Sequence, residues 1–375
     1  MNLMRLSWVG FFAVAVLCEP VAAADRVDDA IKRGVKFLVA NQKQDGAADQ
    51  KGVFVVADDP VRWAARNTYP MTALAVMAMA AVGHQPTEPG EAGKAMQMGI
   101  DFIIRPNPQR DRSNGYFGVD GSRMYGHGIT TLCLGEILGM GVDKAQDRRI
   151  RPELEKAVDL ILRAQQVPKF AAVFTGGWRY EPGSNDADLS ISVWQVMALR
   201  SAQNAGLRVP PQSIDLAVKY LERSYQSPRD ARGRPSNLRT GFGYTPQSRP
   251  TFATTAAGLL SLQVCNKLDA PEVIGAANYL EDIDLKPDLM WFFYGAYYYA
   301  QGMQKRANDD PNSEGSRQAK LGRENVERVM LQQQKADGSW EATNRAENDV
   351  GKIYCTAMAI LSLSVKYHFL PIYQH

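Results

Sequence analysis

A helical pattern that recurs at an almost constant interval is the feature that most constrains how this chain folds. An amphipathic segment ending in an aromatic or aliphatic pair returns at positions 102, 161, 220 and 279, so three successive intervals are equal. Further copies extend the pattern to both ends. The six pairs are Phe37-Leu38, Phe102-Ile103, Ile161-Leu162, Tyr220-Leu221, Tyr279-Leu280 and Val329-Met330. A period of this size predicts stacked units that bury their apolar faces against one another, not two independent domains.

Each amphipathic segment is followed by a second segment that is apolar almost all round and rich in small residues. These second segments are 72–79, 130–136, 192–199, 254–262, 291–300 and 354–363. A helix without a polar face belongs in the interior, whereas charges such as Lys32 and Glu153 place the first segments outside. The sequence therefore predicts an all-α fold in which six helical hairpins close into an inner and an outer ring.

The loops between the two segments often carry glycine beside an aromatic residue. Examples are Gly115-Tyr116-Phe117-Gly118, Gly176-Gly177-Trp178, Gly241-Phe242-Gly243-Tyr244 and Gly338-Ser339-Trp340. Glycine permits positive φ or a close backbone approach, and the ring packs across the turn. We interpret these loops as structural turns, and only the insert Ser184–Asp188 still calls for a functional explanation.

The N-terminal segment 1–24 has the layout of a secretory signal peptide. Arg5 precedes an apolar run that ends at Leu17, and small residues lead up to Ala24. This run is too short for a permanent membrane span. We expect cleavage after Ala24, which leaves one domain of six repeats, 25–375, exported to the periplasm or the extracellular space.

Composition excludes some functions and partners. The net charge is +3 with 22% charged residues, which gives no reason to expect a nucleic-acid partner. The most apolar remaining run, 71–82, has about 12 residues where a span needs about 20, so only contact with a membrane surface is left open. Three cysteines outside the signal lie in apolar helical patterns and are expected to be buried, without disulfide or zinc: Cys133, Cys265 and Cys355. A basic loop, 224–249, has no assigned role.

The repeat resembles the prenyltransferase and squalene-cyclase repeat family. That family's signature is a basic residue with Gly or Ala, an aromatic residue with Leu or Ile, and then Gln, Gly and Trp. The first repeat carries Arg33-Gly34, Phe37-Leu38, Gln42 and Gly46, with Ala48 in place of Trp; the third carries Lys156-Ala157, Leu160-Ile161, Gln165 and, after a longer loop, Gly176-Gly177-Trp178; the sixth carries Gln334, Gly338 and Trp340. The resemblance covers essentially the whole mature chain and implies an α/α toroid with a central cavity.

The same resemblance implies a candidate acid. In the family's protonating cyclases the general acid is the middle aspartate of Asp-x-Asp-Asp. Asp186-Ala187-Asp188-Leu189 keeps the first two acids, which implies Asp188 as proton donor with Asp186 in support, but Leu189 replaces the last acid. The zinc ligands of the family's prenyltransferases have no counterpart around Cys355, and the thioester motif Cys-Gly-Glu-Gln is missing. We therefore expect neither a metal nor a cofactor.

His127 is the expected companion of Asp188. Counting back eleven residues from Leu138 and from Leu199 reaches His127 and Asp188, which would place both at the mouths of neighbouring inner helices. A carboxylic acid near an imidazole predicts a proton-transfer set in which His127 tunes Asp188. The structural alternative is that Asp188 caps its helix and His127 closes a turn.

Aromatic and polar residues are predicted to line the cavity. Arg179 offers a guanidinium and Tyr180 a ring to a ligand. Glu136 lies in an apolar helix, so its carboxylate must face the cavity or find a partner such as Arg200 or a tyrosine. The predicted substrate-binding set is Tyr125, Glu136, Arg179, Tyr180, Trp194, Trp291, Tyr294 and Tyr298. Core packing is the alternative explanation for the aromatic members.

Three functions remain open on the sequence. The first is a terpenoid-cyclase-like enzyme, a cyclase or isomerase, with Asp188 as acid and an apolar, isoprenoid-like substrate. The second is a non-catalytic exported protein that holds a lipid, glycan or peptide in the same cavity. The third is a sugar-cleaving enzyme, which would need two of the carboxylates Glu136, Asp186 and Asp188 about 5 to 9.5 Å apart.

Overall fold

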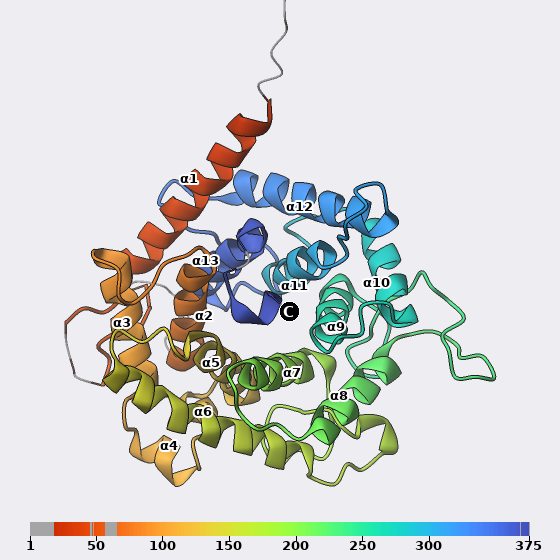
Figure 1. Cartoon of the computed structure of the whole chain (residues 1–375), viewed down its shortest axis with the longest axis horizontal. Coiled ribbons are helices and arrows are strands. Elements are labelled where there is room, and N and C mark those ends of the chain that lie inside the picture. Colours follow the sequence, from red (N-terminus) through yellow and green to blue (C-terminus); the bar gives the residue numbers. More distant parts are fainter. Residues whose placement is uncertain (1–18, 46, 48, 57–65, 368, 375) are drawn as a thin grey trace, which may run out of the picture.

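Six helical hairpins form two concentric rings in the computed structural model of this chain (Figure 1). The structure describes residues 19–45, 47, 49–56, 66–367 and 369–374. Residues 1–18 of the expected signal peptide lie outside this range, so its cleavage stays a prediction. No helix among the described residues has the length and hydropathy needed to cross a membrane.

The first, amphipathic segment of every repeat is an outer helix. The outer helices are α1 (Glu19–Ala40), α3 (Glu91–Ile104), α6 (Lys144–Gln165), α8 (Pro211–Ser224), α10 (Pro271–Glu281) and α12 (Glu314–Gln333), and a short helix, α4 (Pro108–Arg112), lies in the loop after α3. The second, apolar segment is an inner helix. The inner helices are α2 (Thr68–Ala81), α5 (Arg123–Ile137), α7 (Leu189–Asn204), α9 (Phe252–Val264), α11 (Phe292–Gln304) and α13 (Gly351–Leu363). The predicted α/α toroid of six hairpins is confirmed.

The inner helices contact one another in chain order, and α13 returns to contact α2, so the inner ring is closed. Small residues allow the close approach. A Cβ atom added at Gly128 would lie 2.4 Å from Nε2 of Gln195, and one added at Gly135 would lie 2.3 Å from Oγ of Ser201. The glycines of α5 therefore let α7 pack against its backbone, which explains why the inner segments are rich in small residues.

A glutamine at or just after the C-terminal end of an outer helix links one repeat to the next in three places. Each Nε2 donates to the carbonyl oxygen of a turn glycine and to a carbonyl oxygen of the neighbouring outer helix. The pairs are Gln42 to Gly52 (3.0 Å) and Ala95 (2.8 Å), Gln165 to Gly176 (3.0 Å) and Ser213 (2.9 Å), and Gln334 to Gly338 (2.9 Å) and Ala30 (2.8 Å). All three turn glycines have φ between 88° and 94°, which explains why glycine recurs in the repeat.

The first repeat has a longer turn than the sequence pattern indicates. Gly52 takes the place of the turn glycine, and Phe54, two residues later, takes the aromatic place that Trp178 occupies after Gly176. The backbone N–H of Phe54 donates to Thr72 in α2 at 3.4 Å, as that of Trp178 donates to Ser192 in α7 at 2.9 Å. The match to Gly46 and Ala48 was therefore out of register, and both of these residues lie outside the described range.

The three cysteines are buried, as predicted: Cys133, Cys265 and Cys355. The basic loop 224–249 is fastened to α10 by ion pairs. Arg229 lies 2.7 Å from a carboxylate oxygen of Glu272, and Arg239 makes two 2.7 Å hydrogen bonds to Asp282. These arginines hold the loop against the outer ring, so their charge is matched within the fold.

Candidate functional site

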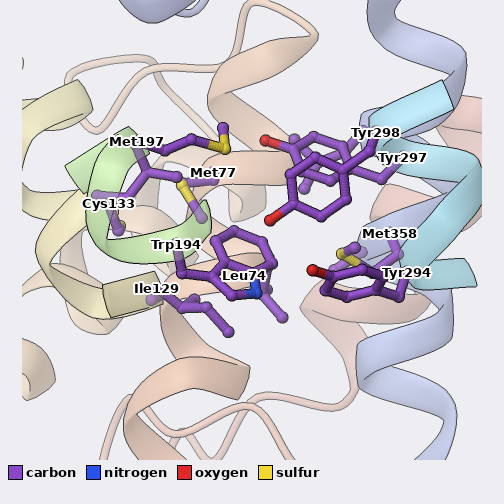
Figure 2. Packing of buried hydrophobic residues seen from close by; sticks show 14 of the residues in the cluster. Leu74, Met77, Ile129, Cys133, Trp194, Met197, Tyr294, Tyr297, Tyr298 and Met358 are labelled. Atoms are coloured by element: carbon purple, nitrogen blue, oxygen red, sulfur yellow. The ribbon is translucent and has the colours of Figure 1, made fainter. Parts of the chain in front are cut away.

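Aromatic side chains fill the axis of the inner ring. The indole of Trp194 stacks on the ring of Tyr297, with centroids 5.9 Å apart and 9° between the planes (Figure 2). It also makes an edge-to-face contact with Tyr298, with centroids 5.5 Å apart. The exposed fraction is 1% for Trp194, 0% for Tyr298 and 7% for Tyr294. These predicted cavity-lining residues pack on one another, so the central cavity expected from the resemblance is filled with protein at this level.

Asp188 lies at the N-terminal end of α7 and caps it. Its Oδ1 accepts a hydrogen bond from the backbone N–H of Ile191 at 3.0 Å and from the hydroxyl of Ser190 at 2.6 Å. Its Oδ2 lies 3.3 Å from Nε of Arg179. The carboxylate is 0% exposed, and this burial raises its pKa above the ordinary value despite the hydrogen bonds and the neighbouring cation.

Arg179 brings Asp186 and Asp188 together. Its Nη1 lies 3.3 Å from Oδ2 of Asp186, while its Nε pairs with Asp188. The guanidinium carbon lies 5.1 Å from the ring centroid of Tyr180 and 5.5 Å from that of Tyr244, and the two phenol oxygens are 2.7 Å apart. We call these five residues the Arg179 cluster. Arg179 is 25% exposed and Asp186 31%, so the cluster reaches the surface at this rim of the ring.

Tyr125 and Lys169 adjoin the Arg179 cluster. The Tyr125 hydroxyl is 2.5 Å from Oγ of Ser190, which in turn donates to Asp188. The Lys169 ammonium donates to the backbone oxygens of Ser184 at 3.0 Å and Asp186 at 3.2 Å. The predicted insert is thus a loop that holds Asp186 beside Arg179.

His127 does not join the Arg179 cluster. Its Nδ1 accepts from the backbone N–H of Phe117 at 3.2 Å, and its Nε2 donates to the carbonyl oxygen of Ala157 at 3.0 Å. The ring is buried, and burial lowers its pKa to about 4. Because both ring nitrogens are engaged with backbone groups, the expected hydrogen bond between His127 and Asp188 is not formed.

The mistaken pairing came from the helix ends. Helix α5 stops before Leu138, whereas α7 continues past Leu199 to Asn204, so the two leucines are not equivalent positions. In the structure His127 corresponds to Ser192, because both side chains accept the backbone N–H of the turn aromatic of their own repeat. His127 therefore fastens a turn, the structural alternative.

Glu136 is far along α5 from its N-terminal rim and pairs with the end of the chain. Its Oε1 accepts from the hydroxyl of Ser201 at 2.5 Å, and its Oε2 accepts from the backbone N–H of Ile372 at 3.0 Å. Burial raises its pKa to about 7. The expected partner Arg200 instead donates to the carbonyl oxygen of Val264.

Trp291 and Tyr294 lie at the start of α11. Trp291 is exposed and has φ 58°, the left-handed region, just before the helix begins. Tyr294 is buried, and its hydroxyl donates to the carbonyl oxygen of Ser190 at 3.4 Å. The side chain of Glu347 caps this helix by accepting the N–H groups of Phe293 and Tyr294, each at 3.0 Å.

Sequence reasoning missed Ser190, Tyr244, Lys169 and Glu347. Tyr244 left a usable signal, since it follows the turn aromatic Phe242 by two residues, as Tyr180 follows Trp178. The two tyrosines therefore emerge at matching places of neighbouring repeats. The side chains of Lys169 and Glu347 make hydrogen bonds to backbone atoms of other segments, and no local sequence pattern predicts such bonds.

No protein-family profile matches this chain, and no curated protein matches it in sequence. Among solved structures, an α-1,6-mannanase from Salegentibacter is similar with a TM-score of 0.60 and 9% identity, over 92% of this chain and 99% of that one. A variant of the type II terpene cyclase MstE from Scytonema, in complex with geranylgeranyl dihydroxybenzoate, is similar with a TM-score of 0.52 and 13% identity, over 93% of this chain and 100% of that one. An unsaturated glucuronyl hydrolase specific for heparin has a TM-score of 0.53 and 14% identity, over 91% and 96%. This chain therefore shares the α/α toroid fold of both terpene cyclases and glycosidases.

Proposed function

We propose that this protein binds a neutral, hydroxyl-rich ligand, a glycan, at the Arg179 cluster. The observation that carries the proposal is the setting of the Arg179 guanidinium, which is partly exposed, lies against two tyrosine rings and is held in place by two carboxylates. Such a site combines aromatic faces with a few fixed polar groups, as ligand-binding sites in proteins commonly do.

The charges of the site favour a neutral ligand. Arg179 lies beside the carboxylates of both Asp186 and Asp188, and the ammonium of Lys169 is bonded to the backbone oxygen of Asp186. Two positive charges thus accompany two carboxyl groups, so neither sign is left in excess for an ionic ligand. The phenol groups of Tyr125, Tyr180 and Tyr244 can each donate and accept a hydrogen bond, as sugar hydroxyls do. A polyol therefore matches both the charge and the hydrogen-bonding capacity of this rim.

An isoprenoid-like ligand is less well supported than a glycan. A large apolar substrate would need an apolar chamber, but Trp194, Tyr294 and Tyr298 fill the axis where that chamber was expected. Glycan-active proteins are among the fold neighbours, including the α-1,6-mannanase, a variant of which was solved with α-1,6-mannotriose. The fold itself is compatible with either substrate class.

Glycan binding can be tested with a neutral and an acidic oligosaccharide array followed by calorimetry. Tyr180→Phe and Tyr244→Phe should each weaken binding about tenfold, because each removes one hydroxyl and keeps the ring. Tyr279→Phe is the matched control, since Tyr279 lies half-buried on the outer helix α10. Preference for acidic glycans, or equal loss in the control, would contradict the proposal.

Hydrolysis of the bound glycan is a second candidate. One guanidinium lies 3.3 Å from a carboxylate oxygen of both Asp186 and Asp188, and burial raises the pKa of Asp188. An acid whose pKa is raised by burial, beside a second carboxylate, is the arrangement used by glycosidases. Released reducing ends from any bound oligosaccharide, lost in both Asp188→Asn and Asp186→Asn, would support it; binding without release would leave a binding protein.

Export is part of the proposal. The N-terminal segment 1–24 carries the features of a signal peptide, and glycans are abundant outside the cytoplasm. Amino-terminal sequencing of the protein recovered from its source should begin at Asp25, whereas a chain that begins at Met1 would show that it is not processed.

A further inference from the structure

The end of the chain enters the mouth of the inner ring opposite the Arg179 cluster. After α13 the chain passes through a 3₁₀ turn (Ser364–Lys366) and reaches a second one (Pro371–Tyr373). The side chains of Leu370, Ile372 and Tyr373 are buried there, and the second turn contacts α7. The mouth is thus closed by a short 3₁₀ turn of the chain.

The contacts in this mouth are those with which proteins recognise a peptide. The buried carboxylate of Glu136 accepts the backbone N–H of Ile372 at 3.0 Å, and the ammonium of Lys305 donates to the backbone oxygen of Tyr373 at 3.3 Å. The hydroxyl of Tyr373 is hydrogen-bonded to that of Tyr297. Side chains of α5 and α11, together with Lys305 directly after α11, bind two main-chain groups and one phenol. Backbone hydrogen bonds give affinity and side-chain contacts give specificity in such sites.

The ring is complete without this segment. The inner ring closes through contact between α13 and α2, and the outer ring closes through Gln334 and Ala30, none of which lies beyond Leu363. Phe369, just before the buried segment, is exposed, and so is Gln374 at its far end. The buried segment therefore lies between two exposed residues and can leave the mouth without opening a hairpin of the toroid.

We propose that this mouth is a peptide-binding site, occupied here by the chain's own residues 370–374. These residues exchange with a peptide that carries an aliphatic residue followed by tyrosine and adopts the same turn. Glu136 and Lys305 bind the peptide main chain, and Tyr297 selects the phenol. Tyr297 also stacks on Trp194, which makes an edge-to-face contact with Tyr294. The hydroxyl of Tyr294 donates to the backbone oxygen of Ser190, next to the Arg179 cluster. The peptide would therefore contact a row of aromatic side chains that extends to the opposite rim.

The test uses the full chain and a labelled synthetic peptide with the sequence of residues 370–375. Tyr373→Ala weakens the chain's own segment, so this variant should bind the labelled peptide at least tenfold more tightly than the wild type, by fluorescence anisotropy. Unlabelled peptide should compete, and a peptide with alanine in place of tyrosine should not. Adding Lys305→Ala to the variant should abolish binding, because the ammonium that holds the main chain is lost.

Tyr367→Ala is the control variant, since Tyr367 belongs to the same terminal segment but pairs with Asp28 outside the mouth. It should bind the labelled peptide no better than the wild type does. No binding to Tyr373→Ala in its folded state, or equal binding to the control, would overturn the proposal.

Hydrogen exchange of the wild-type chain gives a second and independent test in case Tyr373→Ala does not fold. The amides of Ile372 and Tyr373 should exchange through a local opening, much faster than the amides of α7. Exchange of these amides only at the rate of global unfolding would show that the segment is a permanent part of the core and would refute the inference.

Discussion

The side-chain amide of Gln334, in the last repeat, donates to the backbone oxygen of Ala30, in the first, at a distance of 2.8 Å across 304 positions of sequence. The same amide also binds the carbonyl oxygen of Gly338 at 2.9 Å. Equivalent bonds from Gln42 and Gln165 join consecutive repeats. The bond that links consecutive repeats elsewhere in the chain here joins the last repeat to the first, and it thereby closes the outer ring.

Removing this bond should loosen the closure of the ring. Gln334→Ala leaves two carbonyl oxygens without their donor, one of them in the buried residue Ala30, and should lower the free energy of unfolding by about 2 kcal/mol. Gln332→Ala, at an exposed position of the same helix, should change it by less than about 0.5 kcal/mol. Urea unfolding of both variants measures the difference; equal values would mean that the bond does not contribute to closure.

The pH dependence of stability should identify Glu136 as a buried acid. Its pKa is about 7 in the folded protein and near the ordinary 4.5 in the unfolded chain, so the folded state holds its proton more tightly. The resulting stability is fully present below about pH 4.5 and is lost as the pH rises through 7, by up to about 3 kcal/mol. Urea unfolding at pH 5 and pH 8 should show this loss in the wild type and in Glu155→Gln, an exposed control, but not in Glu136→Gln.

His127 should act in the opposite direction. Burial lowers its pKa from 6.5 to about 4, so the folded state disfavours the protonated ring. Its contribution is fully present above about pH 6.5 and is lost as the pH falls towards 4, by about 2 kcal/mol at pH 5. His127→Gln does not titrate and keeps one acceptor and one donor, so its unfolding free energy should fall less than that of the wild type between pH 7.5 and pH 5. A parallel fall in both proteins would place the ring in contact with solvent.

The two aspartates that share Arg179 should differ in their effect on stability. Asp188→Ala removes the cap of α7 and a buried partner of the guanidinium, which should cost about 2 kcal/mol. Asp186→Ala removes a partly exposed ion pair and should cost less than about 1 kcal/mol. Thermal and urea unfolding can compare them, and equal costs would contradict the view that burial separates the two carboxylates.

Local patterns in the sequence were enough to assign the inner and outer helices. The run from Thr72 to Met79 has no polar face and is buried throughout, whereas α6 keeps Glu155 exposed to solvent. These features depend on the period of a helix, so they can be read within one repeat. The cap of α7 by Asp188 was likewise visible, because a cap bonds residues two or three positions away.

Register across repeats was harder to predict than helix type. The first turn is longer than expected, so the turn glycine and the turn aromatic are Gly52 and Phe54, not the positions of Gly46 and Ala48 to which the pattern was fitted. Helices α5 and α7 end at different positions, so His127 lies one helical turn away from the position equivalent to Asp188. Hydrogen bonds between side chains and the backbone determine which residues are equivalent between repeats, and these bonds cannot be predicted from the length of a loop.

By itself the sequence determined that this chain forms six hairpins with apolar helices inside, because hydrophobic periodicity and turn glycines act over short stretches of chain. Only the tertiary structure decided what occupies the centre. Trp194 packs on Tyr297, and Glu136 accepts a hydrogen bond from Ile372, 236 positions away. Such pairings depend on how the closed ring brings distant side chains to one axis, where burial strongly favours hydrogen-bonded arrangements of polar groups.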